Sequence, residues 1–138
     1  MAESSNMATV RRFYSNLGSP EVLMELLSPT VEYDITPGFP YGGVYRGVES
    51  VFNVFFAKVL GDFGDWKTEM SELIDAGDRV VALGVYSGRS KATGIAFSSR
   101  FVHVWTLADN RMVRLQQCAD TAQLHAASRG STPRDSLD

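Results

Sequence analysis

The sequence predicts an α+β domain in which three N-terminal helices pack on a strongly curved, mainly antiparallel sheet and enclose a pocket. Two observations lead to this class. Residues 7–60 carry three apolar stripes with helical spacing, whereas residues 66–121 hold four long runs that each suit a strand. Helices followed by a strand meander are typical of α+β folds with the helices on one face of the sheet. Polar side chains that point into the pocket would carry any chemistry.

The first two helices are predicted over residues 7–17 and 21–27. In the first helix Asn6 is the expected cap, and the apolar positions recur at i, i+3, i+4 and i+7, as on one face of a helix. These positions are Val10, Phe13, Tyr14 and Leu17. The second helix is expected to begin with Ser19 as N-cap and Pro20 as its first residue, where the missing N–H of proline has no cost.

A short strand at 31–35, a loop at 36–43 and a helix at 48–60 follow. The loop is rich in proline and glycine and carries Phe39 and Tyr41, so it either closes over the pocket mouth or packs on its own domain. The helix has a broad apolar stripe that is typical of a core-facing surface. The stripe consists of Val51, Phe52, Phe55, Phe56 and Val59.

The four long strands are predicted at 66–75, 79–89, 95–107 and 111–120. Residues 75–78 and 108–110 have the composition of hairpin turns. Gly84, Gly88 and Gly94 stand within or beside these strands, where glycine often marks a bulge or a sharp bend. One domain is expected over residues 1–125, and residues 126–138 read as a disordered tail.

Composition excludes several classes of function. The net charge of −3 and the pI of about 5.3 argue against a nucleic-acid partner. No apolar run reaches the roughly 18 residues of a membrane span, and no secretory signal is visible, so a cytoplasmic protein without a membrane partner is expected. Cys118 is the only cysteine. Neither metal-ligand spacing nor a phosphate-binding loop is present, so we expect no metal and no cofactor.

Several segments, in this order and at this spacing, carry a family resemblance. They are residues 12–14, 30–33, 43–47, 76–81, 101–105, 112–114 and 120–121. Together they resemble the nuclear transport factor 2-like superfamily, and within it the SnoaL-like polyketide cyclase and ketosteroid isomerase-related branch. The resemblance implies a cone-shaped, cystatin-like fold with a deep apolar cavity. It also implies a homodimer through the outer sheet face and a small apolar or polycyclic ligand.

Asp120 is the main catalytic candidate that the resemblance suggests. In SnoaL-like cyclases an aspartate on the last strand acts as general acid and base, and Asp120 matches that position. A carboxylate facing an apolar cavity has its pKa raised by desolvation, towards the range that suits proton transfer from a carbon acid. The alternative is that Asp120 ends the strand and caps the following segment, with Thr121 as helper.

His103 is the second candidate, because the SnoaL-like pattern also has a histidine on this strand. A neutral imidazole near Asp120 would hold a substrate oxygen or share a proton. The alternative is a packed, hydrogen-bonded core histidine. Alternation places His103 on one face with Phe101 and Trp105 and places Arg100 on the other, although a bulge would change which face lines the pocket.

Tyr14 is the third candidate, since a tyrosine on this helix helps to form the oxyanion hole of ketosteroid isomerases. The rest of that pattern fails. The position of the protonated acid holds Val102, and the position of the catalytic base holds Tyr33, with Asp34 one residue further on. The resemblance therefore does not predict 3-oxosteroid isomerisation, and Tyr14 alone suits either pocket lining or plain core.

Further pocket-lining candidates come from the helices and strands. They are Tyr33, Phe52, Phe55, Tyr86, Arg100, Val102 and Trp105. The leading hypothesis is a cofactor-free pocket protein that binds a small, apolar, oxygenated cyclic molecule, with acid–base cyclisation or isomerisation as its chemistry. A non-catalytic binding or dimeric association module is the alternative. Epoxide hydrolysis ranks third, because Arg100 and Asp120 supply only part of the required Asp–Arg–Asp arrangement.

Overall fold

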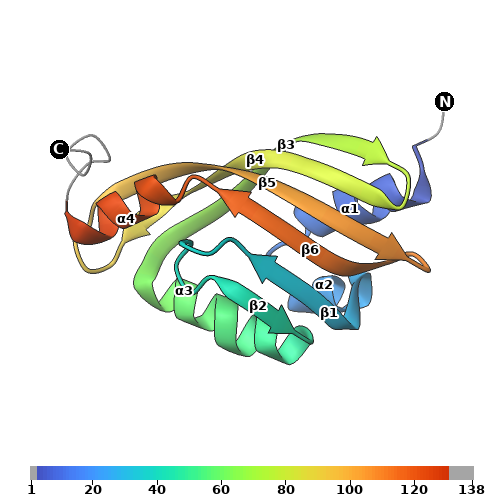
Figure 1. Cartoon of the computed structure of the whole chain (residues 1–138), viewed down its shortest axis with the longest axis horizontal. Coiled ribbons are helices and arrows are strands. Elements are labelled where there is room, and N and C mark those ends of the chain that lie inside the picture. The colour runs from blue at the N-terminus through green and yellow to red at the C-terminus, as the bar shows by residue number, and fades with distance from the viewer. Residues whose placement is uncertain (1–2, 131–138) are drawn as a thin grey trace.

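Four α-helices, one π-helical segment and six strands make up residues 3–130, the part of the chain that this computed structural model describes (Figure 1). The helices are α1 (Ser5–Ser15), α2 (Pro20–Leu26), α3 (Ala57–Asp62) and α4 (Thr121–Arg129), and the π-helical segment is η1 (Ser50–Phe56). The strands are β1 (Leu27–Ile35), β2 (Gly43–Arg46), β3 (Phe63–Ala76), β4 (Arg79–Ser90), β5 (Ala96–Ala108) and β6 (Arg111–Ala119).

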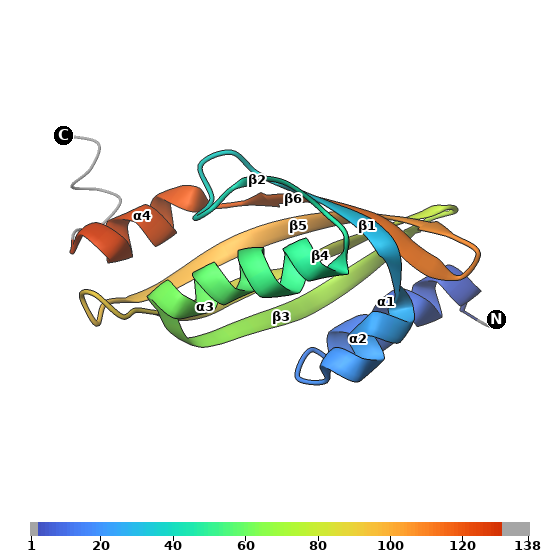
Figure 2. The same ribbon diagram turned by 90° about the horizontal axis from the view of Figure 1, so that it is seen from below.

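The strands form one curved sheet in the order β2-β1-β6-β5-β4-β3. β1 runs parallel to β6, and every other neighbouring pair is antiparallel. Helices α1, α2 and α3 lie on the same side of this sheet, and α4 continues from the end of β6 and lies against the ends of β4 and β5 (Figure 2). The predicted α+β class, with helices on a curved and mainly antiparallel sheet, is confirmed. None of the helices between residues 3 and 130 is long and apolar enough to cross a membrane.

The first two helices follow the predicted apolar pattern. Val10 and Phe13 of α1 are buried in the core. The cap differs from the prediction, because Ser4 accepts a hydrogen bond from the Met7 N–H at 3.2 Å and fills the N-cap role. Asn6 instead donates to the Gly77 carbonyl at 2.9 Å, which ties α1 to the turn between β3 and β4. The predicted start of α2 at Ser19 and Pro20 is confirmed.

The region between α2 and α3 contains more strand than the sequence indicates. β1 begins at Leu27, four residues before the predicted start, because that residue already pairs with Met112 of β6. β2 was not predicted, since only four residues pair along the sheet edge and Val44 is half-exposed there. The predicted third helix is continuous but opens with η1, which buries Val51 and Phe55.

The C-terminal segment corrects one further expectation. Residues 126–129 are the last part of α4 rather than part of a disordered tail, and Ala126 and Ala127 are buried. Alanine and leucine favour helix, and Leu124 gives this short helix an apolar side to bury against the sheet ends. The rest of the predicted tail, residues 131–138, lies outside the described residues.

Gly84 marks a bulge, as the sequence predicts. The pairing of β3 with β4 shifts by one residue between Met70 and Glu72, opposite Gly84. A Cβ atom on Gly84 would overlap the Glu69 carbonyl oxygen and lie 2.8 Å from Phe101 Cε2. The absent side chain therefore lets β3 and the Phe101 ring approach the β4 backbone closely, which fixes the position of Phe101 inside the sheet.

Candidate functional site

A cavity of about 530 Å³ lies between the helices and the inner face of the sheet. This volume is within the range of about 300–1,000 Å³ that is usual for small-molecule sites. The structure brings together seven of the predicted site residues around it: Tyr14, Tyr33, Phe52, Phe55, Tyr86, His103 and Trp105. Most of the remaining lining is aliphatic or aromatic. None of the described residues that line it carries an Asp, Glu, Lys or Arg side chain.

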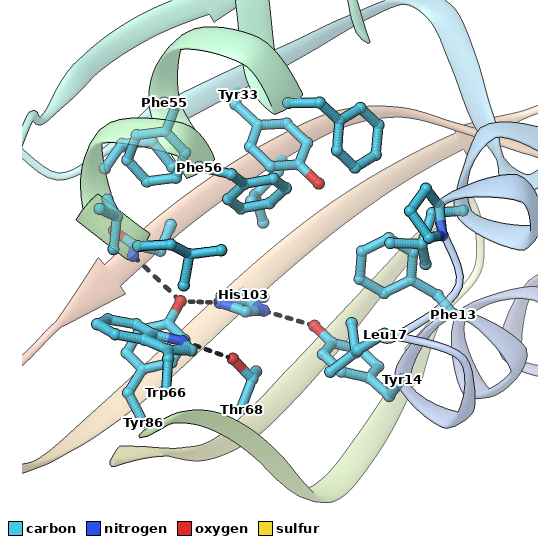
Figure 3. A pocket seen from close by; sticks show the side chains of 18 of the residues that line it. Phe13, Tyr14, Leu17, Tyr33, Phe55, Phe56, Trp66, Thr68, Tyr86 and His103 are labelled. Carbon is cyan, nitrogen blue, oxygen red and sulfur yellow. Dashed lines mark hydrogen bonds between the residues drawn. The ribbon is translucent and has the colours of Figure 1, made fainter. Parts of the chain in front are cut away.

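His103 lies at the centre of the polar part of the cavity (Figure 3). The imidazole is 5% exposed, and the Phe101 ring stacks on it with a centroid separation of 4.1 Å. The Tyr14 hydroxyl lies 2.5 Å from Nδ1, and the Tyr86 hydroxyl lies 2.5 Å from Nε2. Helix α1 and strand β4 thus each supply one phenol to the same imidazole.

Each of these two tyrosine hydroxyls also accepts a hydrogen bond from a second side chain. The Trp105 indole N–H donates to the Tyr14 hydroxyl at 2.8 Å, and the Gln117 side-chain amide donates to the Tyr86 hydroxyl at 3.1 Å. The backbone N–H of Thr36 donates to Gln117 Oε1 at 3.3 Å, so the amide nitrogen must face Tyr86. We call the set Trp105, Tyr14, His103, Tyr86 and Gln117 the His103 network.

The His103 network contains one hydroxyl hydrogen that has no acceptor within the network. Both hydroxyl oxygens already accept one hydrogen bond, from Trp105 and from Gln117. A neutral imidazole donates to one tyrosine oxygen and accepts from the other. The tyrosine that receives the imidazole N–H has then used both lone pairs, and its own hydroxyl hydrogen is left over. That hydrogen belongs to Tyr14 or to Tyr86, depending on the His103 tautomer.

Burial keeps this network uncharged at neutral pH. Desolvation lowers the pKa of His103 to about 3, since an imidazolium ion would be removed from water with no carboxylate beside it. Desolvation also raises the pKa of Tyr14 and of Tyr86 above the usual value for a phenol. The arrangement therefore offers a neutral hydrogen-bond donor to a ligand oxygen and carries no ionised base.

The other predicted residues do not reach the cavity. Arg100 and Val102 face the outer side of the sheet, because the buried set on β5 is Phe101, His103 and Trp105. Asp120 is also exposed on that side and is the N-cap residue of α4, without a side-chain cap hydrogen bond. The carboxyl group of Asp120 and the imidazole of His103 thus belong to opposite faces.

Asp34, one residue beyond the base position of the isomerase pattern, lies outside the cavity as well. The carboxylate accepts a hydrogen bond from Arg114 at 3.1 Å, next to a second contact between Arg114 and Glu32. Tyr33, its neighbour, faces inward. On β5 it is His103, and not Val102, that the Tyr14 hydroxyl contacts. This chain therefore lacks both carboxyl groups of the ketosteroid isomerase arrangement in its cavity.

Sequence reasoning missed one important cavity residue, Gln117, and named Phe39 only as part of a loop that either closes over the pocket mouth or packs on its own domain. Gln117 fixes the orientation of Tyr86, and its position could have been inferred from Leu115, which is apolar and stands two residues earlier on the same face of β6. Phe39, on the loop at 36–43, is 4% exposed and packs on Phe55 and Tyr86 with centroid separations of 6.2 and 5.8 Å. The loop thus closes one part of the cavity wall with an aromatic ring.

A curved, mainly antiparallel sheet with three helices on one face and an apolar cavity between them is the architecture of the nuclear transport factor 2-like class. The family model described as a SnoaL-like domain matches residues 10–115, which is most of the chain. This protein therefore belongs to the SnoaL-like family, as the sequence resemblance predicts. No curated protein matches the sequence at a significant level.

Solved structures agree with this assignment. An NTF2-like protein from Burkholderia thailandensis is 32% identical, with a TM-score of 0.80, and the match covers 91% of this chain and 98% of that chain. TerC, co-crystallised with polyporic acid, is 26% identical, with a TM-score of 0.82 and coverage of 91% and 99%. A putative SnoaL-like polyketide cyclase from Jannaschia sp. is 20% identical, with a TM-score of 0.75 and coverage of 92% and 96%, and shows the fold alone.

Proposed function

We propose that this protein binds a small, mostly apolar cyclic molecule and donates a hydrogen bond from the His103 network to a carbonyl oxygen of that molecule. The observation that carries the proposal is the hydroxyl hydrogen left over on Tyr14 or Tyr86 inside an otherwise apolar cavity. An apolar cavity with few convergent polar groups is the usual form of a small-molecule site. The co-crystallisation of the similar protein TerC with polyporic acid also supports a small organic ligand.

The chemistry that fits this site is cofactor-free stabilisation of an enolate oxygen. A hydrogen-bond donor already held in a dry cavity stabilises negative charge as it develops on oxygen. Proton removal needs a base, and both ring nitrogens of His103 are occupied by Tyr14 and Tyr86, so the C–H proton would pass to water. The proposed substrates are therefore carbonyl compounds whose C–H is already acidic, such as those with a carbon between two carbonyl groups. Cyclisation or isomerisation of such a compound is the proposed reaction class.

The carbonyl preference is testable with 1-tetralone and tetralin, which share a bicyclic skeleton and differ by one oxygen. We expect the wild-type protein to bind 1-tetralone about fivefold more tightly or better, since a hydrogen bond in a dry site is worth about 1 kcal/mol or more. The double variant Tyr14→Phe/Tyr86→Phe removes both hydroxyls and keeps both rings, and it should weaken this preference. Isothermal titration calorimetry measures the two affinities.

The single variants and a control complete this test. Whichever of Tyr14→Phe and Tyr86→Phe removes the donating hydroxyl should weaken the preference alone. Tyr41 is exposed and lies outside the His103 network, so Tyr41→Phe should keep it. Equal affinity of the wild-type protein for the two compounds, or an unchanged preference in the double variant, would contradict the proposal.

A non-catalytic association module is the second candidate, and the outer face of the sheet favours it. This face carries Leu83, Val85 and Val102 around a hollow, and Val102 is 37% exposed. Apolar side chains on an exposed sheet face are typical of surfaces that bind another protein. We therefore propose that two copies associate through this face.

Replacing Val102 with lysine tests the association. A lysine beside Leu83 and Val85 introduces a charge that must be desolvated when a second copy covers this face, so the dimer should dissociate. Sedimentation velocity over a range of concentrations should show a dimer for the wild-type protein and a monomer for Val102→Lys. Thr106→Lys, on the same face of β5 but nearer its end, is the control that should leave the dimer intact. A wild-type protein that stays monomeric at every concentration would rule out this candidate.

A further inference from the structure

Tyr33 carries a polar group that the protein itself does not use. The residue is 2% exposed, and its hydroxyl is the one buried side-chain polar atom within residues 3–130 that lacks a protein hydrogen-bond partner. Buried polar groups in native proteins are nearly always paired, and leaving one unpaired is unfavourable. A phenylalanine would fill the same space without this penalty. The hydroxyl therefore requires an explanation beyond packing.

The surroundings of Tyr33 direct the hydroxyl towards the cavity. Its ring packs edge-on against Phe56 and Trp105, with centroid separations of 6.0 and 5.7 Å. The nearby Trp105 N–H already donates to Tyr14. Figure 3 shows the Tyr33 oxygen pointing into the open space, across the cavity from the hydroxyl of Tyr14. A ligand in the cavity is therefore the partner that Tyr33 can reach.

Tyr33 and the His103 network stand on different strands. Tyr33 belongs to β1 and His103 to β5, with β6 between them. Two strand spacings separate their backbones by roughly 10 Å. Between them lie Leu115, which pairs with Tyr33 in the sheet, and the Trp105 ring, which contacts both Tyr33 and His103. The cavity thus presents two polar points with a dry, largely aromatic stretch in between.

We propose that the Tyr33 hydroxyl is a second ligand-binding group, so that the cavity selects ring compounds with two oxygen functions set apart on one apolar scaffold. This inference rests on the proposed function, because the first oxygen is the one that binds the His103 network. The second oxygen meets a phenol hydroxyl, which can both donate and accept. Hydroxyketones and diketones of cyclic compounds therefore suit the site, whereas a ring with a single oxygen leaves Tyr33 unpaired.

The test compares 1-tetralone with 4-hydroxy-1-tetralone and 6-hydroxy-1-tetralone, which add a second oxygen at two different distances from the carbonyl. Affinities for the wild-type protein, Tyr33→Phe and the control Tyr41→Phe are measured by isothermal titration calorimetry. At least one hydroxytetralone should bind the wild-type protein about fivefold more tightly than 1-tetralone. Tyr33→Phe should remove this gain, so that this variant binds the hydroxytetralone and 1-tetralone with the same affinity, whereas Tyr41→Phe should retain the gain.

Thermal unfolding separates ligand binding from a structural role. Without ligand, the melting temperature of Tyr33→Phe should equal or exceed that of the wild-type protein, since an unpaired hydroxyl is removed. A lower melting temperature would show that the hydroxyl supports the fold and would overturn the inference. So would the absence of any gain from a second oxygen, or a gain that persists in Tyr33→Phe. Failure of the wild-type protein to bind 1-tetralone would instead reject the proposed function, and the inference with it.

Discussion

The wild-type protein is expected to lose stability on mild acidification, and replacing His103 with glutamine should abolish most of this pH-dependent loss. In the folded protein burial lowers the pKa of His103 to about 3, whereas an unfolded chain has a histidine pKa of about 6.5. Between these values the unfolded state binds a proton that the folded state does not. The contribution of His103 is therefore fully present above pH 6.5 and is lost as the pH falls, by about 1.4 kcal/mol per pH unit.

The measurement is the free energy of unfolding in urea, taken at intervals from pH 7.5 to pH 5. The wild-type curve should fall below pH 6.5, and the His103→Gln curve should be flatter over that window. At pH 7.5 the variant should be less stable by about 1–3 kcal/mol, because glutamine cannot reproduce both tyrosine contacts. His125→Gln is the matched control, since His125 is exposed. Parallel curves for the wild-type protein and His103→Gln would contradict a buried, neutral imidazole.

Adding a single methyl group at Gly84 is expected to destabilise the fold by about 3 kcal/mol. The new Cβ would overlap both the Glu69 carbonyl oxygen and the Phe101 ring. The backbone oxygen belongs to the paired strand β3 and cannot move without breaking pairing. Overpacking of a dense interior usually costs about 1–3 kcal/mol, and here two neighbours resist at once.

The Gly84 substitution should also affect the site. Phe101 stacks on Tyr86 as well as on His103, with centroid separations of 4.5 and 4.1 Å. A displaced Phe101 ring would therefore push against the His103 network, and Gly84→Ala should weaken binding of 1-tetralone in addition to lowering stability. Urea unfolding and calorimetry provide the two measurements.

Gly61 provides the matched control for this substitution. It lies in α3, and a Cβ there would meet nothing within 4 Å. Gly61→Ala should be neutral or stabilising by about 0.5–1 kcal/mol, as is usual for alanine in a helix. Adding Phe101→Leu to Gly84→Ala should restore only part of the lost stability, because the clash with Glu69 remains. A Gly84→Ala protein as stable as the wild-type protein would contradict this prediction, because it would show that β3 moves away from the new Cβ at little cost.

The fold could be predicted from the sequence because each helix and each long strand repeats the same residue pattern many times. Apolar spacing repeats over several helical turns, and strand composition persists over ten residues or more, so local errors at Leu27 or Gly43 do not change the architecture. The short edge strand β2 escaped prediction since four residues carry too little pattern. α4 was not predicted, because residues 126–138, with serine, glycine, proline and mixed charges, have the composition of a tail, whereas the helix that begins at Thr121 continues to Arg129.

The site was less accessible, because it depends on which way individual side chains face. Asp120 was predicted to face the pocket because it matches the position of an aspartate on the last strand of the family pattern. The alternation of Leu115 and Gln117 on β6 instead directs Asp120 to the other face of the sheet. The pairing of His103 with two tyrosines joins α1, β4 and β5. No single segment of sequence contains that geometry, and it follows only from the packing of all three elements.

The aromatic lining of the cavity makes the intrinsic fluorescence of the protein sensitive to what the cavity contains. Trp66 and Trp105 are the only two tryptophans in the sequence, and both line the cavity. An indole changes its emission when its polarity or its contacts change. Occupation of the cavity therefore alters the surroundings of every strongly emitting chromophore in the molecule, with no background from tryptophans elsewhere. Intrinsic fluorescence thus follows the interior of this protein without an attached dye.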